Sequence, residues 1–116
     1  MPKGDALAVA RLAGIQAAKR TADWVPLAHV LPLDRVAVEF ERGEGGLSIR
    51  SEVVVSGRTG AEMEALVACS AAALALYDMV KAVERGAVIT DLRLETKSGG
   101  KSGDWRRAKR GAETGS

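Results

Sequence analysis

The sequence predicts an α+β fold, in which an antiparallel sheet is covered by two helices. Val36, Val38 and Phe40 alternate with polar neighbours, and residues 47–55 repeat this alternation after a glycine-rich loop at 43–46. Two such runs joined by a short loop are typical of a β-hairpin. Alanine-rich apolar stretches before and after the hairpin predict the two helices.

The first helix is expected over residues 6–20, with Asp5 as its N-cap. One face of this helix is expected to be apolar apart from its last member and follows the helical spacing, with alanines filling in beside it. Its members are Ala8, Leu12, Ile15 and Lys19, and the alanines are Ala10, Ala13, Ala17 and Ala18. The low aromatic content, 3%, predicts a core built from Ala, Val and Leu.

The second helix is expected over residues 61–85, ending at Gly86. Its run at 68–76 is almost entirely small and apolar, which predicts a helix covered on most sides. Residues 88–94 alternate between apolar and polar side chains and predict a third strand.

The expected element order is therefore α-β-β-α-β. A ferredoxin-like plait, βαββαβ, has this order with one more strand in front. We expect this plait with its first strand missing from the chain. That strand lies in the middle of the usual sheet, so its absence leaves backbone groups unpaired. An upstream segment, a neighbouring chain or a rearranged strand order could fill the gap.

The composition fits one domain with a packed core, with 116 residues of which 47% are hydrophobic. We divide it into a catalytic domain over 3–96 and a Gly/Lys-rich phosphate-binding segment with a basic tail over 97–116. One cysteine and one histidine exclude an internal disulfide and a conventional zinc site. No apolar run reaches the ~18 residues of a membrane helix, and no signal peptide is visible, so we expect a cytoplasmic protein without membrane contact.

The net charge of +2 is unevenly distributed. Residues 1–96 carry a net charge of −2 and residues 97–116 a net charge of +4. A basic end of this kind attracts a polyanion, such as a phosphate group, a nucleic acid or an acidic protein.

Six ordered stretches of the chain resemble the molybdenum cofactor biosynthesis protein C family, the cyclic pyranopterin monophosphate synthases. They are KGD at 3–5, AGIQAAKRT at 13–21, PLAH at 26–29, TGAEMEAL at 59–66, YDMVKAV at 77–83 and KSGGKSGD at 97–104. Two departures stand out. Leu27-Ala28-His29-Val30 replaces the family's Leu-Cys-His-Pro, and the family's N-terminal portion, with an early strand and helix, is absent.

The resemblance implies a lyase that converts cyclised dihydro-GTP (3′,8-cyclo-7,8-dihydroguanosine triphosphate) to cyclic pyranopterin monophosphate with release of pyrophosphate. A radical enzyme supplies the precursor. The family is a hexamer, a trimer of dimers, with sites at subunit interfaces. No organic cofactor is implied, and an Mg²⁺ ion with the triphosphate is possible but leaves no ligand signature.

Asp78 and Lys81 are spaced to share one helix face and are the predicted acid–base pair. Spacing alone favours a surface salt bridge. The apolar surroundings favour a buried pair, in which burial lowers the pKa of the lysine. The resemblance adds Lys3 as the partner of Lys81.

His29 lies among apolar residues, where a histidine is commonly a hydrogen-bonded core residue; the resemblance makes it a substrate-binding residue. Glu62, Met63 and Glu64 open the second helix, where acidic residues suit the helix dipole. A carboxylate there could instead accept hydrogen bonds from the amino and ring N–H groups of a guanine-type base. Met63 is then a substrate-binding residue that packs against the ring, or it simply fills the core. Residues one or two apart point in different directions, so Glu62 and Glu64 are not expected to serve one site together.

Lys19, at the end of the first helix, and Lys97 and Lys101, in the Gly-rich segment, are the predicted cationic contacts to the substrate. The segment lacks the spacing of a P-loop. It is either a flexible basic tail or a lid whose amides and lysines close over the triphosphate.

Two other functions remain open at this point. The chain could be a catalytically impaired relative of the family that binds nucleotides or serves in assembly. A small α+β domain with a basic, Trp-bearing end could also bind RNA. The predicted strands lack aromatic stacking pairs, which makes nucleic acid an unlikely partner.

Overall fold

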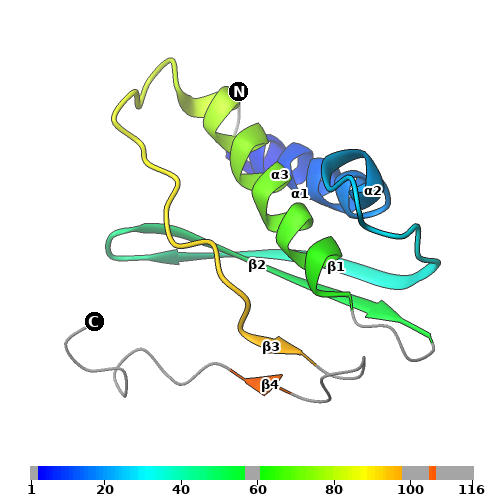
Figure 1. Cartoon of the computed structure of the whole chain (residues 1–116). Coiled ribbons are helices and arrows are strands. Elements are labelled where there is room, and N and C mark those ends of the chain that lie inside the picture. Colours follow the sequence, from blue (N-terminus) through cyan, green and yellow to red (C-terminus); the bar gives the residue numbers. More distant parts are fainter. Residues whose placement is uncertain (1–2, 57–60, 98–104, 107–116) are drawn as a thin grey trace.

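The computed structural model describes residues 3–56, 61–97 and 105–106. Its elements are helix α1 (Lys3–Ala18), the short helix α2 (Thr21–Trp24), strands β1 (Leu33–Gly43) and β2 (Gly46–Val55), helix α3 (Glu62–Val80), and the short strands β3 (Thr96–Lys97) and β4 (Trp105–Arg106). Figure 1 shows α1 and α3 together on one face of the β1–β2 hairpin. The predicted α+β class, with an antiparallel sheet covered by two helices, is confirmed.

The hairpin forms where the alternating pattern predicts it. β1 and β2 pair antiparallel, with Val38 opposite Ser51 and Gly43 opposite Gly46 at the turn. Gly46 has a φ of 147°, a conformation that glycine adopts without strain. Val38 is 2% exposed and faces the helices, whereas Glu39, the next residue in sequence, is exposed to solvent.

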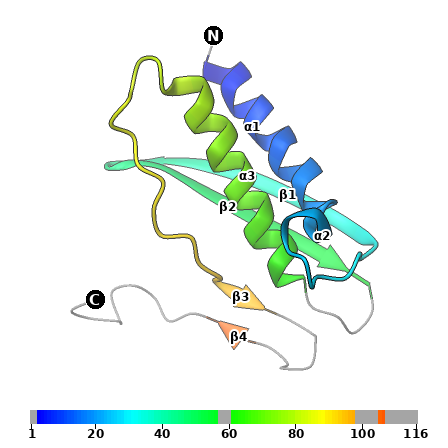
Figure 2. The ribbon, with the colours of Figure 1, turned by 45° about the horizontal axis from the view of Figure 1, so that its top comes forward.

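The two long helices run antiparallel (Figure 2), and small side chains fill the contact between them. The buried residues at this contact are Ala6, Ala10, Ala17 and Ala18 of α1, and Val67, Ala68, Ala71 and Ala72 of α3. Gly14 lies at the closest approach, where an added Cβ would be 2.7 Å from the backbone oxygen of Ala68. Alanine and valine make up this core as predicted, while leucines lie only at its margin.

The predicted apolar face of α1 is right for Ala10, Ala17 and Ala18, which are buried, and wrong for Ala8 and Leu12. Leu12 is 55% exposed, and Ala8 is exposed as well. Closely packed helices select the stripe with the smallest side chains, because only that stripe lets the backbones approach. The helix also begins at Lys3, so Asp5 lies in its first turn and is not its N-cap.

α3 is shorter than predicted, and less of its surface is buried against other elements than predicted. It ends at Val80, six residues before Gly86. Leu74 is 54% exposed, so the helix is covered by α1 and the hairpin but is open elsewhere. The sequence analysis found no apolar run long enough to span a membrane, but α3 is long and apolar enough to do so. Core helices of globular proteins meet the same criteria.

The predicted third strand does not form. Within the described residues the only strand pairs are β1–β2 and β3–β4, so residues 88–94 belong to neither. Figure 1 shows this segment running past β2 without joining the hairpin, and Asp91 within it has a φ of 61°. A strand needs a neighbouring edge to pair with, and in a plait that neighbour is the central strand. The complete plait and the boundary at residue 96 remain predictions.

Candidate functional site

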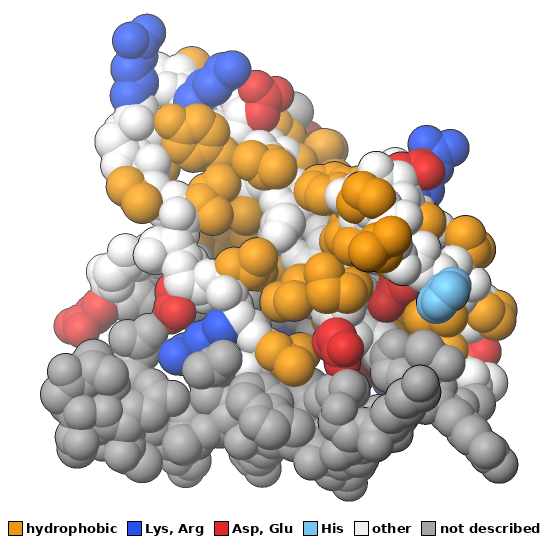
Figure 3. Space-filling model, in the orientation of Figure 1, with side chains coloured by type: hydrophobic (Ala, Val, Ile, Leu, Met, Phe, Trp, Pro, Cys, Tyr) orange, Lys and Arg blue, Asp and Glu red, His pale blue; other side chains and the backbone are white. Residues whose placement is uncertain are grey.

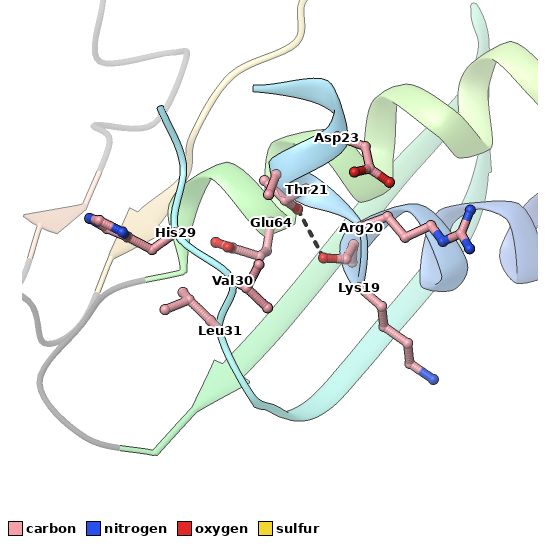
Figure 4. Close-up of a pocket in the computed structure, with 10 residues that line it drawn as sticks. Lys19, Arg20, Thr21, Asp23, His29, Val30, Leu31 and Glu64 are labelled. Carbon is pink, nitrogen blue, oxygen red and sulfur yellow. Dashed lines mark hydrogen bonds between the residues drawn. The ribbon is translucent and has the colours of Figure 1, made fainter. Parts of the chain in front are cut away.

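A small pocket opens at the end of the helix pair where α1 ends and α3 begins (Figure 4). Its volume is about 120 Å³, and it is lined by residues 18–23, residues 29–31 and Glu64. Three segments far apart in the sequence therefore meet at one point. Pockets for whole small-molecule ligands usually measure roughly 300–1,000 Å³, so this one can hold a single chemical group of a nucleotide.

The turn between α1 and α2 shapes one side of the pocket. Thr21 is 3% exposed, and its hydroxyl donates a 2.9 Å hydrogen bond to the carbonyl oxygen of Ala18. Lys19 and Arg20 occupy this turn and remain exposed. Figure 4 shows their side chains extending away from Glu64, so both cations are available to a ligand that approaches from outside.

Glu64 is the most buried charged residue of this pocket. It lies in the first turn of α3 and is 4% exposed. The positive end of the helix dipole favours a carboxylate at this position. Figure 4 shows the carboxylate directed toward the side of the pocket where His29 lies. A carboxylate at this depth can accept hydrogen bonds from N–H donors that enter the pocket.

Glu62 and Met63 do not line this pocket, although both were predicted to bind substrate. Met63 is 37% exposed and Glu62 is half-buried. Glu64 lines this pocket and Glu62 does not; that the two glutamates do not serve one site together stays a prediction.

Asp78 and Lys81 form an ion pair near the other end of α3. The Lys81 Nζ lies 2.9 Å from an Asp78 carboxylate oxygen, and the two side chains are 58% and 72% exposed, respectively. The hydrogen bond and charge of Asp78 raise the pKa of Lys81 above its ordinary 10.5. The expectation that burial lowers this pKa is therefore wrong for the single chain, because α3 leaves this face open to water.

The predicted site residues fall into two groups at opposite ends of the helix pair. Glu64 and Lys81 are separated by 17 positions, which corresponds to about 26 Å along a helix. Because α1 runs antiparallel to α3, the backbone of Lys3 lies at the Lys81 end (Figure 2), and Lys19 lies at the Glu64 end. The single chain thus brings Lys19, His29 and Glu64 together, and does not bring them to Asp78 and Lys81.

The remaining predicted contacts lie near or beyond the limits of the described structure. Lys97 belongs to the short strand β3, and Lys101 lies outside the described residues.

Thr21 and Asp23 line the pocket without having been predicted. They follow Lys19 directly, so placing the end of α1 at Ala18 would have drawn attention to them. In the part of the chain that the structure describes, no three His, Cys, Asp or Glu side chains converge on a metal position.

Comparisons with known proteins agree on one family. The sequence model of the MoaC family matches residues 1–100. Relatives named cyclic pyranopterin monophosphate synthase include one from Streptomyces avermitilis, 56% identical over 108 residues, which are 93% of this chain and 64% of the relative. One from Streptomyces griseus is 58% identical over 107 residues, which are 92% of this chain and 60% of the relative. The chain thus spans 60–64% of the length of these Streptomyces relatives.

Proposed function

The chain belongs to the MoaC family, and on this premise we propose that it acts in cyclic pyranopterin monophosphate synthesis. The proposed substrate is cyclised dihydro-GTP, 3′,8-cyclo-7,8-dihydroguanosine triphosphate. The proposed products are cyclic pyranopterin monophosphate and pyrophosphate. We place the activity in the cytoplasm, next to the radical enzyme that supplies the precursor.

One observation carries this proposal. Three family-like stretches, at 13–21, 26–29 and 59–66, contribute residues to the same pocket, although Ala18 and Glu64 in its lining lie 46 positions apart. Packing alone does not require these three stretches to present an imidazole, a buried carboxylate and two exposed cations around one small cavity. A nucleotide requires such a set, since its base offers N–H donors and its phosphates carry negative charge.

The roles follow from the chemistry of each group. Glu64 accepts hydrogen bonds from the amino and ring N–H groups of the guanine-derived ring, for which two adjacent donors suit a bidentate carboxylate. His29 contacts a phosphate or transfers a proton, and Lys19 neutralises phosphate charge. Lys97 and Lys101 belong to the segment that closes over the triphosphate. No organic cofactor is part of the proposal, and Mg²⁺ would arrive with the triphosphate.

Asp78, Lys81 and Lys3 are the proposed proton-transfer group, because opening and rebuilding the ring requires several proton transfers. The distance of about 26 Å between Lys81 and Glu64 along α3 supports a site shared between two copies of the chain. One copy would present its Asp78–Lys81 end to the pocket of another, within a hexamer built as a trimer of dimers. Exclusion of water at that interface would then lower the pKa of Lys81 toward a value useful for catalysis.

A second candidate is nucleotide binding without turnover. Ala28 and Val30 flank His29 where the family carries a thiol and a proline, and Val30 lines the pocket. Without the rigid proline, His29 could bind a phosphate without being held in the orientation that proton transfer requires.

Incubating the chain with the cyclised nucleotide and measuring pyranopterin and pyrophosphate tests the proposal. Glu64→Gln and Lys81→Ala should each lower the rate by at least ~100-fold, whereas Arg85→Ala, an exposed cation outside both groups, should leave it unchanged. A wild-type chain that forms no product, but binds the nucleotide with an affinity that Glu64→Gln reduces, supports the second candidate. Absence of both product and binding contradicts both candidates.

A further inference from the structure

Thr21 is a buried residue of the pocket wall to which the proposed function gives no role. It is 3% exposed and follows the exposed Lys19 and Arg20 at the start of α2. A buried hydroxyl needs a hydrogen-bond partner, and this one donates to the carbonyl oxygen of Ala18, 2.9 Å away (dashed line in Figure 4). Bonds of this kind are common near helix ends. Here the acceptor belongs to the last residue of α1.

The acceptor oxygen lies in the peptide unit that leads into Lys19. Because a peptide unit is planar, the Ala18 carbonyl group and the N and Cα atoms of Lys19 tilt together. The last carbonyl groups of an α-helix find no partner within the helix, so a side-chain donor at this point restricts the tilt. The hydroxyl of Thr21 therefore sets the direction in which the exposed Lys19 side chain leaves the end of α1.

The backbone of Thr21 continues the connection toward His29. Its carbonyl oxygen accepts a 2.9 Å hydrogen bond from the Val25 N–H, and the Val25 carbonyl oxygen accepts a 3.0 Å bond from the Ala28 N–H. Val25 is half-buried against one of the small-residue clusters between α1 and α3. Two hydrogen bonds thus lead from Thr21 to the residue that precedes His29.

Packing does little to hold the segment that carries His29. Leu27 and Val30, on either side of it, are 93% and 81% exposed. Figure 3 shows the one histidine of the chain, in pale blue, at the surface of the molecule. Segments with few buried apolar contacts are the least stable parts of a fold. The position of His29 therefore depends on the hydrogen bonds at the start of its segment.

We propose that Thr21 is a positioning residue of the candidate site. It sets where Lys19 and His29 stand relative to Glu64. The inference rests on the proposed function, in which these three side chains contact one nucleotide. Thr21 acts through the other residues, because its own hydrogen is directed to a backbone oxygen. A displacement of about 1 Å at a reacting group can cost about 100-fold in rate, so a bond that orients two such groups has a measurable effect.

Three variants test this role. Thr21→Val keeps the branched shape and removes the donor, whereas Thr21→Ser keeps the donor. Ser70→Ala is the matched control, because the Ser70 hydroxyl donates a 2.8 Å hydrogen bond to the carbonyl oxygen of Leu66 within α3 and does not line the pocket. We expect amide hydrogen exchange at Val25 and Ala28, measured by NMR, to become at least ~10-fold faster in Thr21→Val alone.

The rate of pyranopterin formation from the cyclised nucleotide should follow the same order. It should fall about 10–100-fold in Thr21→Val, return close to the wild-type rate in Thr21→Ser, and stay unchanged in Ser70→Ala. A loss of folded chain would lower the rate by the same factor in every background. We therefore expect Thr21→Val to cost less in the Lys19→Ala and His29→Ala chains than in the wild type.

Three results overturn the proposal: unchanged exchange in Thr21→Val, an equal loss of rate in Ser70→Ala, or an equal loss in all three backgrounds. If the wild type binds the cyclised nucleotide without turnover, its affinity replaces the rate in the same comparisons. If it does neither, the proposed function fails and exchange alone decides. Faster exchange in Thr21→Val, but not in Thr21→Ser, then supports the positioning of the segment with His29, and equal exchange overturns it.

Discussion

The ion pair of Lys81 and Asp78 shows how exposure decides the behaviour of a charged residue. The two side chains lie on an apolar helix, but on the side that no other element covers. The carboxylate therefore acts on the ammonium through a direct hydrogen bond and its charge, both of which favour the protonated lysine. Desolvation, the effect expected from the apolar neighbours, is the weaker influence here.

We predict that Lys81 in the single chain titrates above 10.5, measured by NMR of its Cε carbon, and that Asp78→Asn moves the midpoint back toward 10.5. A raised pKa in the folded state means that the pair stabilises the fold fully below pH 10.5. This stabilisation is lost as the pH rises through the higher folded value. A midpoint below 10.5 would show that burial dominates, contrary to the exposed geometry.

Contacts between elements depend on the smallest side chains. Gly14 allows α1 to approach α3 so closely that a Cβ at this position would be 2.7 Å from a backbone oxygen and 3.1 Å from a Val38 methyl group. Neither atom is the end of a flexible side chain, so the helices themselves would have to move apart. The glycine is thus required by packing and not by its backbone conformation.

Gly14→Ala should destabilise the fold by about 1 kcal/mol or more in denaturant unfolding. Overpacking of a core costs about 1–3 kcal/mol, and the better helix propensity of alanine offsets up to about 1 kcal/mol of this. Gly86→Ala is the matched control, because its nearest neighbour is the flexible Glu84 carboxylate at 3.6 Å. If both variants unfold at the same denaturant concentration, the close approach of the helices is not a determinant of stability.

The elements also show where sequence patterns succeed and fail. The hairpin is predictable because alternation and the glycines at 43–46 act between near neighbours. Residues 88–94 have the same alternation and still form no ladder, because they lack an adjacent edge. The end of α3 at Val80 and the places of Ala8 and Leu12 on α1 were predicted wrongly, since both depend on what packs against these helices.

At the scale of the whole molecule, the candidate site is divided. Residue types and their roles followed from the resemblance to a family, but their separation into two groups appears only when α1 and α3 are seen to run antiparallel. The pocket group lies at one end and the ion pair at the other. Under the proposed function, a complete site depends on how copies of the chain assemble.

Mixing two inactive variants tests this division. Under the proposed shared site, Glu64→Gln and Lys81→Ala are each inactive, but a mixture re-assembled from both should recover about a quarter of the activity, since half of the pairs contain one intact site. Asp78→Asn mixed with Lys81→Ala should recover none, because every site then carries one defect. Recovery in both mixtures, or in neither while the wild type is active, would contradict a site shared across two copies.

The sequence by itself determined the α+β class, the hairpin, two alanine-rich helices and the family-like stretches. These features arise from periodicity, glycine placement and residue identity, which act over a few neighbouring positions. Only the tertiary structure decided which helix faces are buried, that Glu64 lies in a pocket while Asp78 and Lys81 remain in water, and that no other described strand pairs with the second edge of β2. Each of these depends on contacts between segments tens of residues apart, and no local pattern encodes which segments will meet.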